Sequence, residues 1–333
     1  MPDPVPPSPD LVGKTVIITG GNTGLGFEVA RQTLLLQAAR VIITARSQAK
    51  GADAVAALRA DADIQSANPA AQIEFFDLDL DDYQSGLRFC QQVKKQVPEL
   101  DLLLCNGGTT TFNYEMSKSG HERVMQVNCY THFFIVLELL GLLRATAAKR
   151  GSPTRVTFLG SYSHDIHDLE RTPIPPGCKV LDYFDSNTLT RGVRRYPNSK
   201  LTIIAFVQRL ARQQPASEVI VNSVCPGVVS TRIMSRLPLW MQPLIYVYFK
   251  FKAVPMRVGG QRIVHAAAVV GAESHGQFLS MGGEMEGYAP FLDKDTGQAF
   301  KDKLWTEMLA DGRLVDPAME VFERPPEAPG IVV

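Results

Sequence analysis

From Lys14 onwards, the chain alternates short apolar runs with longer segments that suit helices. The runs expected to form strands are 15–19, 40–44, 73–76, 100–104, 155–159 and 218–224, and the helices expected between them are 25–37, 49–60, 84–96, 121–148 and 199–213. Strands that are apolar throughout are typical of a parallel sheet covered on both faces. Because parallel strands need crossover helices, and these crossovers are right-handed, the pattern predicts an α/β fold with a doubly wound parallel sheet.

The size of the chain favours one domain. With 333 residues, 45% of them hydrophobic, the chain can bury one large core. We expect a disordered tail over residues 1–10, the main domain over 11–310 and a C-terminal tail over 311–333. Lys and Arg total 34, as do Asp and Glu, so no net field would hold the protein on nucleic acid. A small neutral or weakly charged substrate is the better expectation.

The cysteines and the N-terminus bear on the compartment. The five cysteines form neither a CxxC motif nor a cluster with metal-ligand spacing; they are Cys90, Cys105, Cys129, Cys178 and Cys225. This scatter indicates reduced thiols and predicts no metal site. The first ten residues, MPDPVPPSPD, lack the basic start and apolar run of a signal peptide. We therefore expect a cytoplasmic protein.

Two segments interrupt the alternation. Residues 165–196 include a proline-rich stretch, 172–177, and are expected to form a surface insertion beside the site. Residues 237–251, LPLWMQPLIYVYFKF, are the most aromatic stretch and are too short to span a bilayer. They are open to three interpretations: part of a substrate lid over about 232–262, a weak interfacial membrane contact, or core.

A glycine-rich turn follows the first expected strand. It reads Thr19-Gly20-Gly21-Asn22-Thr23-Gly24-Leu25-Gly26, and a helical segment begins at once. Glycines here let the backbone approach a pyrophosphate, whose charge the helix N-terminus favours. The turn predicts a dinucleotide site, although an ordinary tight turn is the alternative.

The spacing TGxxxGxG resembles that of the short-chain dehydrogenase/reductase family, and the resemblance extends over about residues 11–290. It is closest to the longer retinol-dehydrogenase-like and fungal members, and it implies a Rossmann-type fold that binds a nicotinamide dinucleotide. The second strand is followed by Arg46 with no carboxylate beside it. An arginine there suits a ribose 2′-phosphate, so we expect NADP(H). Many NADP-binding members also carry a basic residue between the first two glycines, which Gly21-Asn22-Thr23 lacks.

Further family landmarks follow in order. Asp79-Leu80 resembles the pair beside the adenine, and Asn106-Gly107-Gly108 resembles the family's NAG, with Gly107 in place of alanine. Pro226-Gly227-Val228-Val229-Ser230-Thr231 resembles the segment that borders the nicotinamide, where Thr231 would contact the carboxamide. The resemblance implies cofactor contacts from Gly20, Asn22, Thr23, Gly24, Leu25, Gly26, Arg46, Asp79, Leu80, Asn106, Gly107, Tyr196, Lys200, Pro226, Gly227, Val229 and Thr231.

Carbonyl reduction needs a proton donor, and a phenol serves best when a nearby ammonium lowers its pKa. Tyr-x-x-x-Lys on a helix places the two groups on one face. Four pairs have this spacing: Tyr114/Lys118, Tyr196/Lys200, Tyr246/Lys250 and Tyr248/Lys252. Only Tyr196/Lys200 opens a long helical segment between the fifth and sixth strands, after Ser161 at a strand end. We therefore predict that Tyr196 is the acid.

The resemblance completes a catalytic set with Asn128, in MQVNCYTHF. It implies that the Asn128 carbonyl holds a water joined to Lys200, that Ser161 hydrogen-bonds the substrate oxygen, and that Tyr196 transfers the proton. Two departures stand out: Gly160 replaces the serine before Ser161, and the insertion lengthens the gap to Tyr196. The two histidines that closely follow Ser161, at 164 and 167, either line the pocket or lie at the surface. We expect surface positions, which are the more common for isolated histidines near a loop.

These observations predict an NADP(H)-dependent enzyme that reduces a bulky apolar ketone or oxidises the corresponding secondary alcohol. The resemblance places it among ketoreductases of secondary or lipid-like metabolism. One alternative is a protein that senses NADP(H) without turnover, and another is a redox-neutral epimerase or cyclase. Homo-oligomers are common in the family, although the insertions could block the usual interfaces.

Overall fold

The computed structural model describes residues 11–111, 113–187, 192–229, 253–281, 285–286 and 288–320. The expected tail over 1–10, the aromatic segment 237–251 and Thr231 lie outside the described residues. Of the expected lid, only residues 253–262 are described.

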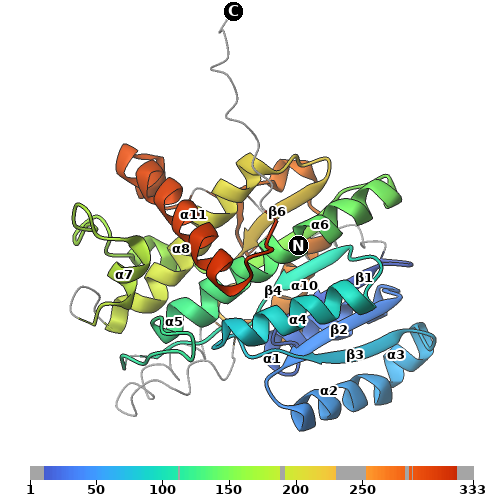
Figure 1. Ribbon diagram of the computed structural model, residues 1–333. Coiled ribbons are helices and arrows are strands. Elements are labelled where there is room, and N and C mark those ends of the chain that lie inside the picture. Colours follow the sequence, from blue (N-terminus) through green and yellow to red (C-terminus); the bar gives the residue numbers. More distant parts are fainter. Residues whose placement is uncertain are drawn as a thin grey trace, which may run out of the picture.

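One sheet runs through the whole molecule (Figure 1). Its strands are β1 (Thr15–Ile18), β2 (Arg40–Ala45), β3 (Gln72–Asp77), β4 (Leu102–Cys105), β5 (Thr154–Leu159), β6 (Val219–Val224), β7 (Phe278–Leu279) and β8 (Met285–Glu286). The order is β3-β2-β1-β4-β5-β6-β7-β8, with parallel pairing from β3 to β7 and an antiparallel β8. The doubly wound α/β fold is confirmed. Sequence patterning missed β7 and β8 because two-residue strands carry no periodicity.

Helices cover both faces of the sheet (Figure 1). They are α1 (Gly24–Leu35), α2 (Gln48–Ala60), α3 (Ala62–Ala67), α4 (Tyr83–Gln96), α5 (Arg123–Met125), α6 (Thr131–Arg150), α7 (Val180–Asp185), α8 (Gly192–Gln213), α10 (Met256–Ala268) and α11 (Asp295–Val315). Successive strand residues point to opposite faces, so Val16 and Ile18 join the core with α1 and α10, whereas Ile17 joins the core with α4, α6 and α8. This explains why the strands are apolar throughout.

The long helix expected over 121–148 is interrupted. Between α5 and α6 lies a π-helical turn, η1 (Gln126–Tyr130), in which the Thr131 amide donates to the Gln126 carbonyl five residues back. The stretch Arg123–Arg150 is long and apolar enough to cross a membrane, but 72% of its most apolar window is buried within the protein. It therefore packs as the central helix of the core.

The insertion after β5 is only partly a surface feature. Residues 170–177 are largely exposed, as expected, but Tyr183 and Phe184 of α7 are fully buried. The Glu307 carboxylate of α11 accepts hydrogen bonds from the amides of Val180 and Leu181 at the start of α7, both 3.0 Å. The free amides at a helix N-terminus bind carboxylates favourably. Helix α11 thus anchors the insertion, and it runs through the domain boundary expected at residue 310.

A half-buried histidine contacts the same two helices. His121, in the loop before α5, contacts Asp185 at the end of α7 (Nδ1–Oδ2 2.7 Å) and Asp311 of α11 (Nε2–Oδ2 3.4 Å). Burial alone would lower the pKa of His121, but the hydrogen bonds to Asp185 and Asp311 outweigh it and raise that pKa to about 9. The imidazolium therefore bridges two carboxylates at neutral pH.

The contacts of His121 with Asp185 and Asp311 predict a specific pH dependence of the free energy of unfolding. A histidine pKa raised from 6.5 to about 9 stabilises the fold fully below pH 6.5, by roughly 3 kcal/mol, and this contribution disappears as pH rises through 9. Urea unfolding of the wild type and of His121→Gln at about pH 6 and pH 9.5 measures this contribution. Titrating groups common to both proteins cancel when the two free energies of unfolding are subtracted. Equal pH slopes in the two proteins would contradict the assignment.

Candidate active site

The glycine turn lies where the strand order reverses, between β1 and β4, the position at which open α/β sheets bind ligands. Gly20 has φ +63°, and an added Cβ would lie 3.0 Å from the Gly107 Cα. At Gly26 an added Cβ would lie 2.5 Å from the Asn106 Nδ2 and 2.6 Å from the Gly20 carbonyl. Asn22 and Thr23 complete the turn, and α1 starts at Gly24-Leu25. Only glycine at these two positions lets the turn close onto β4, which leaves the start of α1 open to an anion.

The turn is held against the end of β4 by Asn106 and Thr19. The Asn106 Nδ2 donates to the Thr19 carbonyl (2.8 Å), and the amides of Asn106 and Gly107 both donate to the Thr19 hydroxyl (2.9 and 3.0 Å). The Leu80 side chain occupies the space that a Cβ on Gly107 would fill. The glycine that departs from the family's NAG is therefore explained by packing against Leu80.

Arg46 immediately follows β2, one strand away from the turn. Its side chain is exposed, and among the described residues no ion pair of Arg46 is found. Thr44, two residues earlier, accepts a hydrogen bond from the Gly20 amide (3.0 Å). This hydrogen bond holds the end of β2 beside the glycine turn. The backbone of Arg46 therefore lies near the turn.

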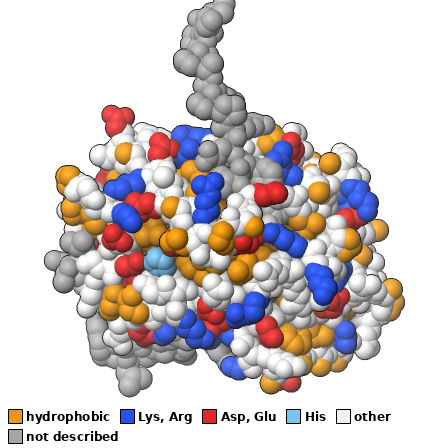
Figure 2. All heavy atoms as spheres, in the orientation of Figure 1, with side chains coloured by type: hydrophobic (Ala, Val, Ile, Leu, Met, Phe, Trp, Pro, Cys, Tyr) orange, Lys and Arg blue, Asp and Glu red, His pale blue; other side chains and the backbone are white. Residues whose placement is uncertain are grey.

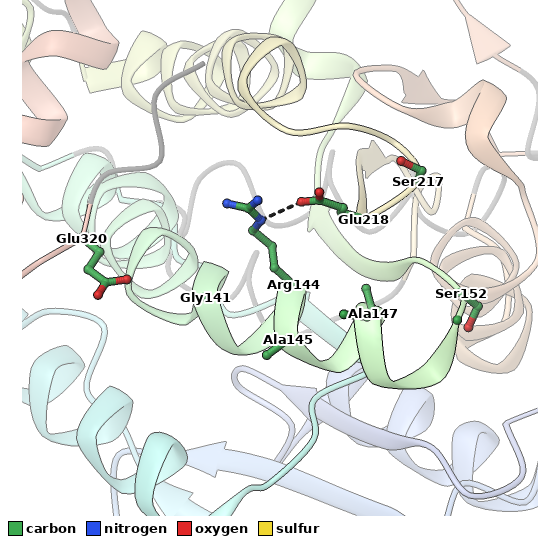
Figure 3. Close-up of a pocket in the computed structure, with 10 residues that line it drawn as sticks. Gly141, Arg144, Ala145, Ala147, Ser152, Ser217, Glu218 and Glu320 are labelled. Carbon is green, nitrogen blue, oxygen red and sulfur yellow. Dashed lines mark hydrogen bonds and ion pairs between the residues drawn. The ribbon is translucent and has the colours of Figure 1, made fainter. Parts of the chain in front are cut away.

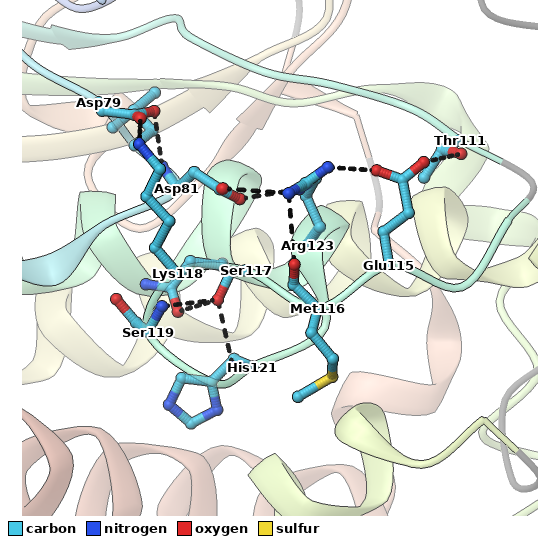
Figure 4. Close-up of polar contacts among 12 residues, drawn as sticks. Asp79, Asp81, Thr111, Glu115, Met116, Ser117, Lys118, Ser119, His121 and Arg123 are labelled. Carbon is cyan, nitrogen blue, oxygen red and sulfur yellow. Dashed lines mark hydrogen bonds and ion pairs between the residues drawn. The ribbon is translucent and has the colours of Figure 1, made fainter.

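Asp79 belongs to a charged cluster beside the site (Figure 4). The Lys118 ammonium contacts the Asp79 carboxylate at 2.8 Å, while Arg123 pairs with Asp81 at 3.0 Å. The Tyr114 hydroxyl donates to the Asp185 carbonyl (2.6 Å). Tyr114 and Lys118 thus have separate partners in a non-helical loop, which agrees with the expectation that they are not the catalytic pair.

Tyr196 and Lys200 lie on α8, as their spacing predicts. The Lys200 ammonium is 5.3 Å from the centroid of the Tyr196 ring and donates to the Leu159 carbonyl at the end of β5 (2.7 Å). Lys200 is only 4% exposed, and burial lowers its pKa to about 8. The structure therefore holds this ammonium beside the phenol at a strand end.

Ser161 lies at the N-terminus of the 3₁₀ turn η2 (Tyr162–Ile166), and its side chain hydrogen-bonds that of Tyr196. Its hydroxyl accepts hydrogen bonds from the Ser163 amide (3.2 Å) and hydroxyl (2.9 Å). Burial raises the pKa of Tyr196 to about 12, against the lowering effect of a hydrogen bond with Ser161. The surrounding chain thus raises the phenol pKa, whereas the sequence led us to expect a lowering. The reason is that desolvation outweighs the hydrogen bond with Ser161.

Asn128, in the π-turn, is buried and connects the other members of the site. Its amide nitrogen donates to the Ser199 hydroxyl (3.0 Å) and the Thr109 carbonyl (3.1 Å), and its side-chain oxygen accepts from the Thr109 amide (2.8 Å). The Ser199 hydroxyl in turn donates to the Tyr196 carbonyl (2.7 Å). The structure thus brings the four predicted residues to one edge of the sheet, with Ser199 as a connecting residue that motif spacing did not single out.

Two further polar groups were misjudged or missed from the sequence. His164 is fully buried rather than at the surface, because its Nδ1 donates to the Ser161 carbonyl at 2.6 Å and its ring packs on Phe278. Asn198 of α8 and Asp168 exchange two hydrogen bonds, at 2.8 and 3.2 Å. The Asn198–Asp168 hydrogen bonds hold the segment after Ser161 against α8, whereas His164 packs that segment on β7. Neither contact has a signal in local sequence, because Asn198 and Phe278 are distant in the sequence.

The segment after β6 lies at the same edge. The Pro226 carbonyl accepts from Arg262 of α10 (2.9 Å), and an added Cβ on Gly227 would lie 2.7 Å from the Met281 sulfur. Val229 is buried and forms a bridge with Val254. Residues 226–229 are thus held in place by contacts with α10, Met281 and Val254.

A hollow of ≈ 750 Å³ lies elsewhere, on the outer side of α6 (Figure 3). It is lined by Gly141, Arg144, Ala145, Ala147, Ala148, Gly151, Ser152, Ser217, Glu218 and Glu320. Arg144 and Glu218 form an ion pair across it at 2.6 Å. None of the predicted site residues lines it, so it is separate from the active site. The surface in the view of Figure 2 carries basic and acidic side chains interspersed.

Comparison with known proteins agrees with this geometry. Residues 14–161 match the family model for short chain dehydrogenases. The short chain dehydrogenase sor7 of Hypocrea jecorina is 48% identical over 280 residues, which cover 83% of this chain and 78% of that protein. The short chain dehydrogenase macD of Penicillium terrestre is 39% identical over 308 residues, covering 92% and 93%.

Solved structures show the same fold. An NADP active-site complex of RhlG from Pseudomonas aeruginosa superposes with a TM-score of 0.62 at 22% identity, covering 83% of this chain and 98% of that one. A blue fluorescent protein from a metagenomic library, in complex with NADPH, gives a TM-score of 0.59 at 20% identity, covering 82% and 98%. The chain is 48% and 39% identical to these two relatives over most of its length, and it has the same fold as the solved structures. It therefore belongs to the short-chain dehydrogenase family of oxidoreductases.

Proposed function

We propose that the protein is an NADP(H)-dependent ketoreductase that interconverts a bulky apolar ketone and its secondary alcohol, with Tyr196 as the acid and base. The observation that carries the proposal is the connected set of Asn128, Ser199, Tyr196 and Lys200 beside Ser161, at the edge of the sheet where the glycine turn lies.

The residues present fit a dinucleotide. The glycine turn closes onto β4 and leaves the start of α1 open to a pyrophosphate. Arg46 would hold the 2′-phosphate, with Asp79 and Leu80 beside the adenine, Asn106 and Gly107 below the turn, and Pro226, Gly227 and Val229 beside the nicotinamide. When bound, the cofactor supplies or accepts the hydride.

The chain's own residues supply the proton chemistry. A phenol whose pKa is raised to about 12 keeps its proton at neutral pH and is ready to donate it to a carbonyl oxygen. The Ser161 hydroxyl would hydrogen-bond the same oxygen. As the phenolate forms, the buried Lys200 ammonium stabilises it, since charges interact strongly where water is excluded. The protonated phenol at neutral pH is the form that ketone reduction requires.

The preference for NADP(H) rests on Arg46 and predicts a change of cofactor selectivity. Losing one charge-assisted contact with the 2′-phosphate, about 1.5–3 kcal/mol, lowers the ratio of NADPH to NADH kcat/KM by roughly 10- to 100-fold. Arg46→Ala should show this decrease mainly through the NADPH value. Arg313→Ala, which removes another exposed charge, on α11, should leave the ratio unchanged; an equal effect of both variants would exclude a specific phosphate contact.

The substrate class rests on the aromatic segment 237–251, which follows the nicotinamide-bordering segment in the sequence. The fungal relatives sor7 and macD are short chain dehydrogenases by name, and we extend the proposal to ketones of secondary or lipid-like metabolism. An aromatic lid would bind such ketones by burying apolar surface.

The decisive experiment measures consumption of NADPH and NADH by the purified protein over a panel of apolar ketones of increasing size. NADPH-selective turnover whose kcat/KM rises with apolar size supports the proposal. Tight NADPH binding without turnover would favour a cofactor-sensing protein instead. NADPH that stays bound through desalting, with a rearranged product, would favour a redox-neutral epimerase or cyclase.

A further inference from the structure

His132 lies one helical turn after Asn128, inside α6, and is 1% exposed. Its imidazole connects two parts of the site. The Nδ1 atom is 3.3 Å from the Asn128 backbone carbonyl oxygen, and the Nε2 atom is 2.9 Å from the Thr19 hydroxyl at the base of the glycine turn. The His132 side chain thus bridges Thr19, at the base of the glycine turn, and Asn128, which contacts Ser199 of α8.

The charge of His132 follows from its surroundings. Burial lowers the pKa of the ring to about 4, and the Lys200 ammonium adds to the lowering, while the Asn128 carbonyl opposes it. The ring is therefore neutral at physiological pH and carries one proton, which lies on either Nδ1 or Nε2.

Counting donors around Thr19 assigns that proton. The Thr19 hydroxyl has one hydrogen and two lone pairs, and both lone pairs accept, from the Asn106 and Gly107 amides. Its own hydrogen is free for the His132 Nε2 at 2.9 Å, a shorter contact than the Leu104 carbonyl at 3.3 Å. Nε2 must then be the acceptor, and Nδ1 carries the proton and donates to the Asn128 carbonyl.

The opposite tautomer is unfavourable. With the proton on Nε2, Thr19 would have to accept three hydrogen bonds, and the bare Nδ1 would face the Asn128 carbonyl lone pairs. Two acceptors facing each other in a buried site repel, and both remain unsatisfied.

We propose that His132, in its neutral Nδ1–H form, is a positioning residue that links the dinucleotide turn at Thr19 to the catalytic residues at Asn128. The linkage continues through hydrogen bonds already described: Asn128 holds the Ser199 hydroxyl, which holds the Tyr196 carbonyl. The His132 imidazole therefore positions both Thr19, at the base of the glycine turn, and Asn128, which is linked to Tyr196 through Ser199. The kinetic part of this inference rests on the proposed function; the tautomer does not.

The tautomer is tested directly by NMR of the ¹⁵N-histidine-labelled wild-type protein. We expect His132, identified by the signal that His132→Asn removes, to show a protonated Nδ1 and a bare Nε2, unchanged between about pH 6 and 9. A protonated Nε2, or titration within that range, would overturn the proposal without any measurement of turnover.

Two amide variants separate the two contacts. An asparagine amide at 132 reaches the position of Nδ1 and a glutamine amide reaches that of Nε2, so each retains one contact. His132→Gln should lower kcat roughly tenfold with the NADPH Kd within about twofold, whereas His132→Asn should keep kcat within about threefold and raise the NADPH Kd about fivefold. A purely structural role would lower the melting temperature of both variants and give no such crossed pattern, which would overturn the positioning role.

The two proposals fail in different ways. Absence of turnover on every ketone would overturn the proposed function, while the NMR spectrum and the NADPH titration would still decide the inference on His132. If neither amide variant folds, the wild-type spectrum decides it alone, with the His132 signal identified by its NMR contacts to Thr19 and Asn128.

Discussion

Replacing Tyr196 with phenylalanine is expected to lower kcat/KM for ketone reduction by roughly 1000-fold, within the range that a positioned general acid contributes. The substitution removes only the hydroxyl, so the ring, its packing and the nearby Lys200 ammonium at 5.3 Å remain. The NADPH Kd should therefore change less than about threefold. Steady-state kinetics and fluorescence titration of NADPH measure the two effects separately.

The matched control is Tyr114→Phe. Tyr114 has the same spacing to a lysine, but its hydroxyl donates to the Asp185 carbonyl away from Ser161. This variant should lose a little stability and keep its turnover. Retention of more than about a tenth of the activity in Tyr196→Phe would remove Tyr196 from the proton-donor role. Equal losses in both variants would point to a structural effect instead.

A methyl group at Gly26 is expected to cost most of the cofactor affinity. The Cβ of Gly26→Ala would lie 2.6 Å from the Gly20 carbonyl and 2.5 Å from the Asn106 amide, so the turn must open. If two charge-assisted hydrogen bonds to the pyrophosphate are lost, at about 1.5 kcal/mol each, the NADPH Kd rises roughly 100-fold. Isothermal titration of NADPH measures the change.

Gly86→Ala is the control for the added methyl group. Gly86 is also helical, in α4, and its added Cβ would meet the Thr131 methyl group at 3.2 Å, far less closely. This variant should bind NADPH with wild-type affinity. Unchanged affinity in Gly26→Ala, with an intact melting temperature, would show that the turn does not hold the phosphates.

Much of the fold follows from local sequence. A strand buried on both faces must be apolar at every position, and a crossover helix must follow it. The six longer strands and five of the longer helices can therefore be placed from the sequence within a few residues, apart from the start of α8 and the break at η1. The periodic pattern did not place α10 and α11. The glycine turn is likewise visible in local sequence, because its glycines stand in a short motif between a strand and a helix. The Tyr196/Lys200 pair could be selected among four by its place in the strand order.

Other features depend on partners that are distant in the sequence. The two-residue strand β7 pairs with β6, which lies more than 50 residues earlier in the sequence, and β8 pairs with β7. The π-turn at Asn128 and the burial of His164 arise from packing between elements, and no period or propensity encodes them. The same holds for α7, which α11 caps from 126 residues further along the chain.

The sequence by itself determined the doubly wound sheet and the glycine turn, because each rests on periodicity or on a short motif. The family resemblance added the four candidate catalytic residues. Only the tertiary structure decided the electrostatic state of the site. The pKa of Tyr196 is raised to about 12 and that of Lys200 lowered to about 8, since desolvation depends on every atom packed around a group. For the same reason, the proton on His132 could be assigned only when Thr19 and Asn128 were seen on either side of it.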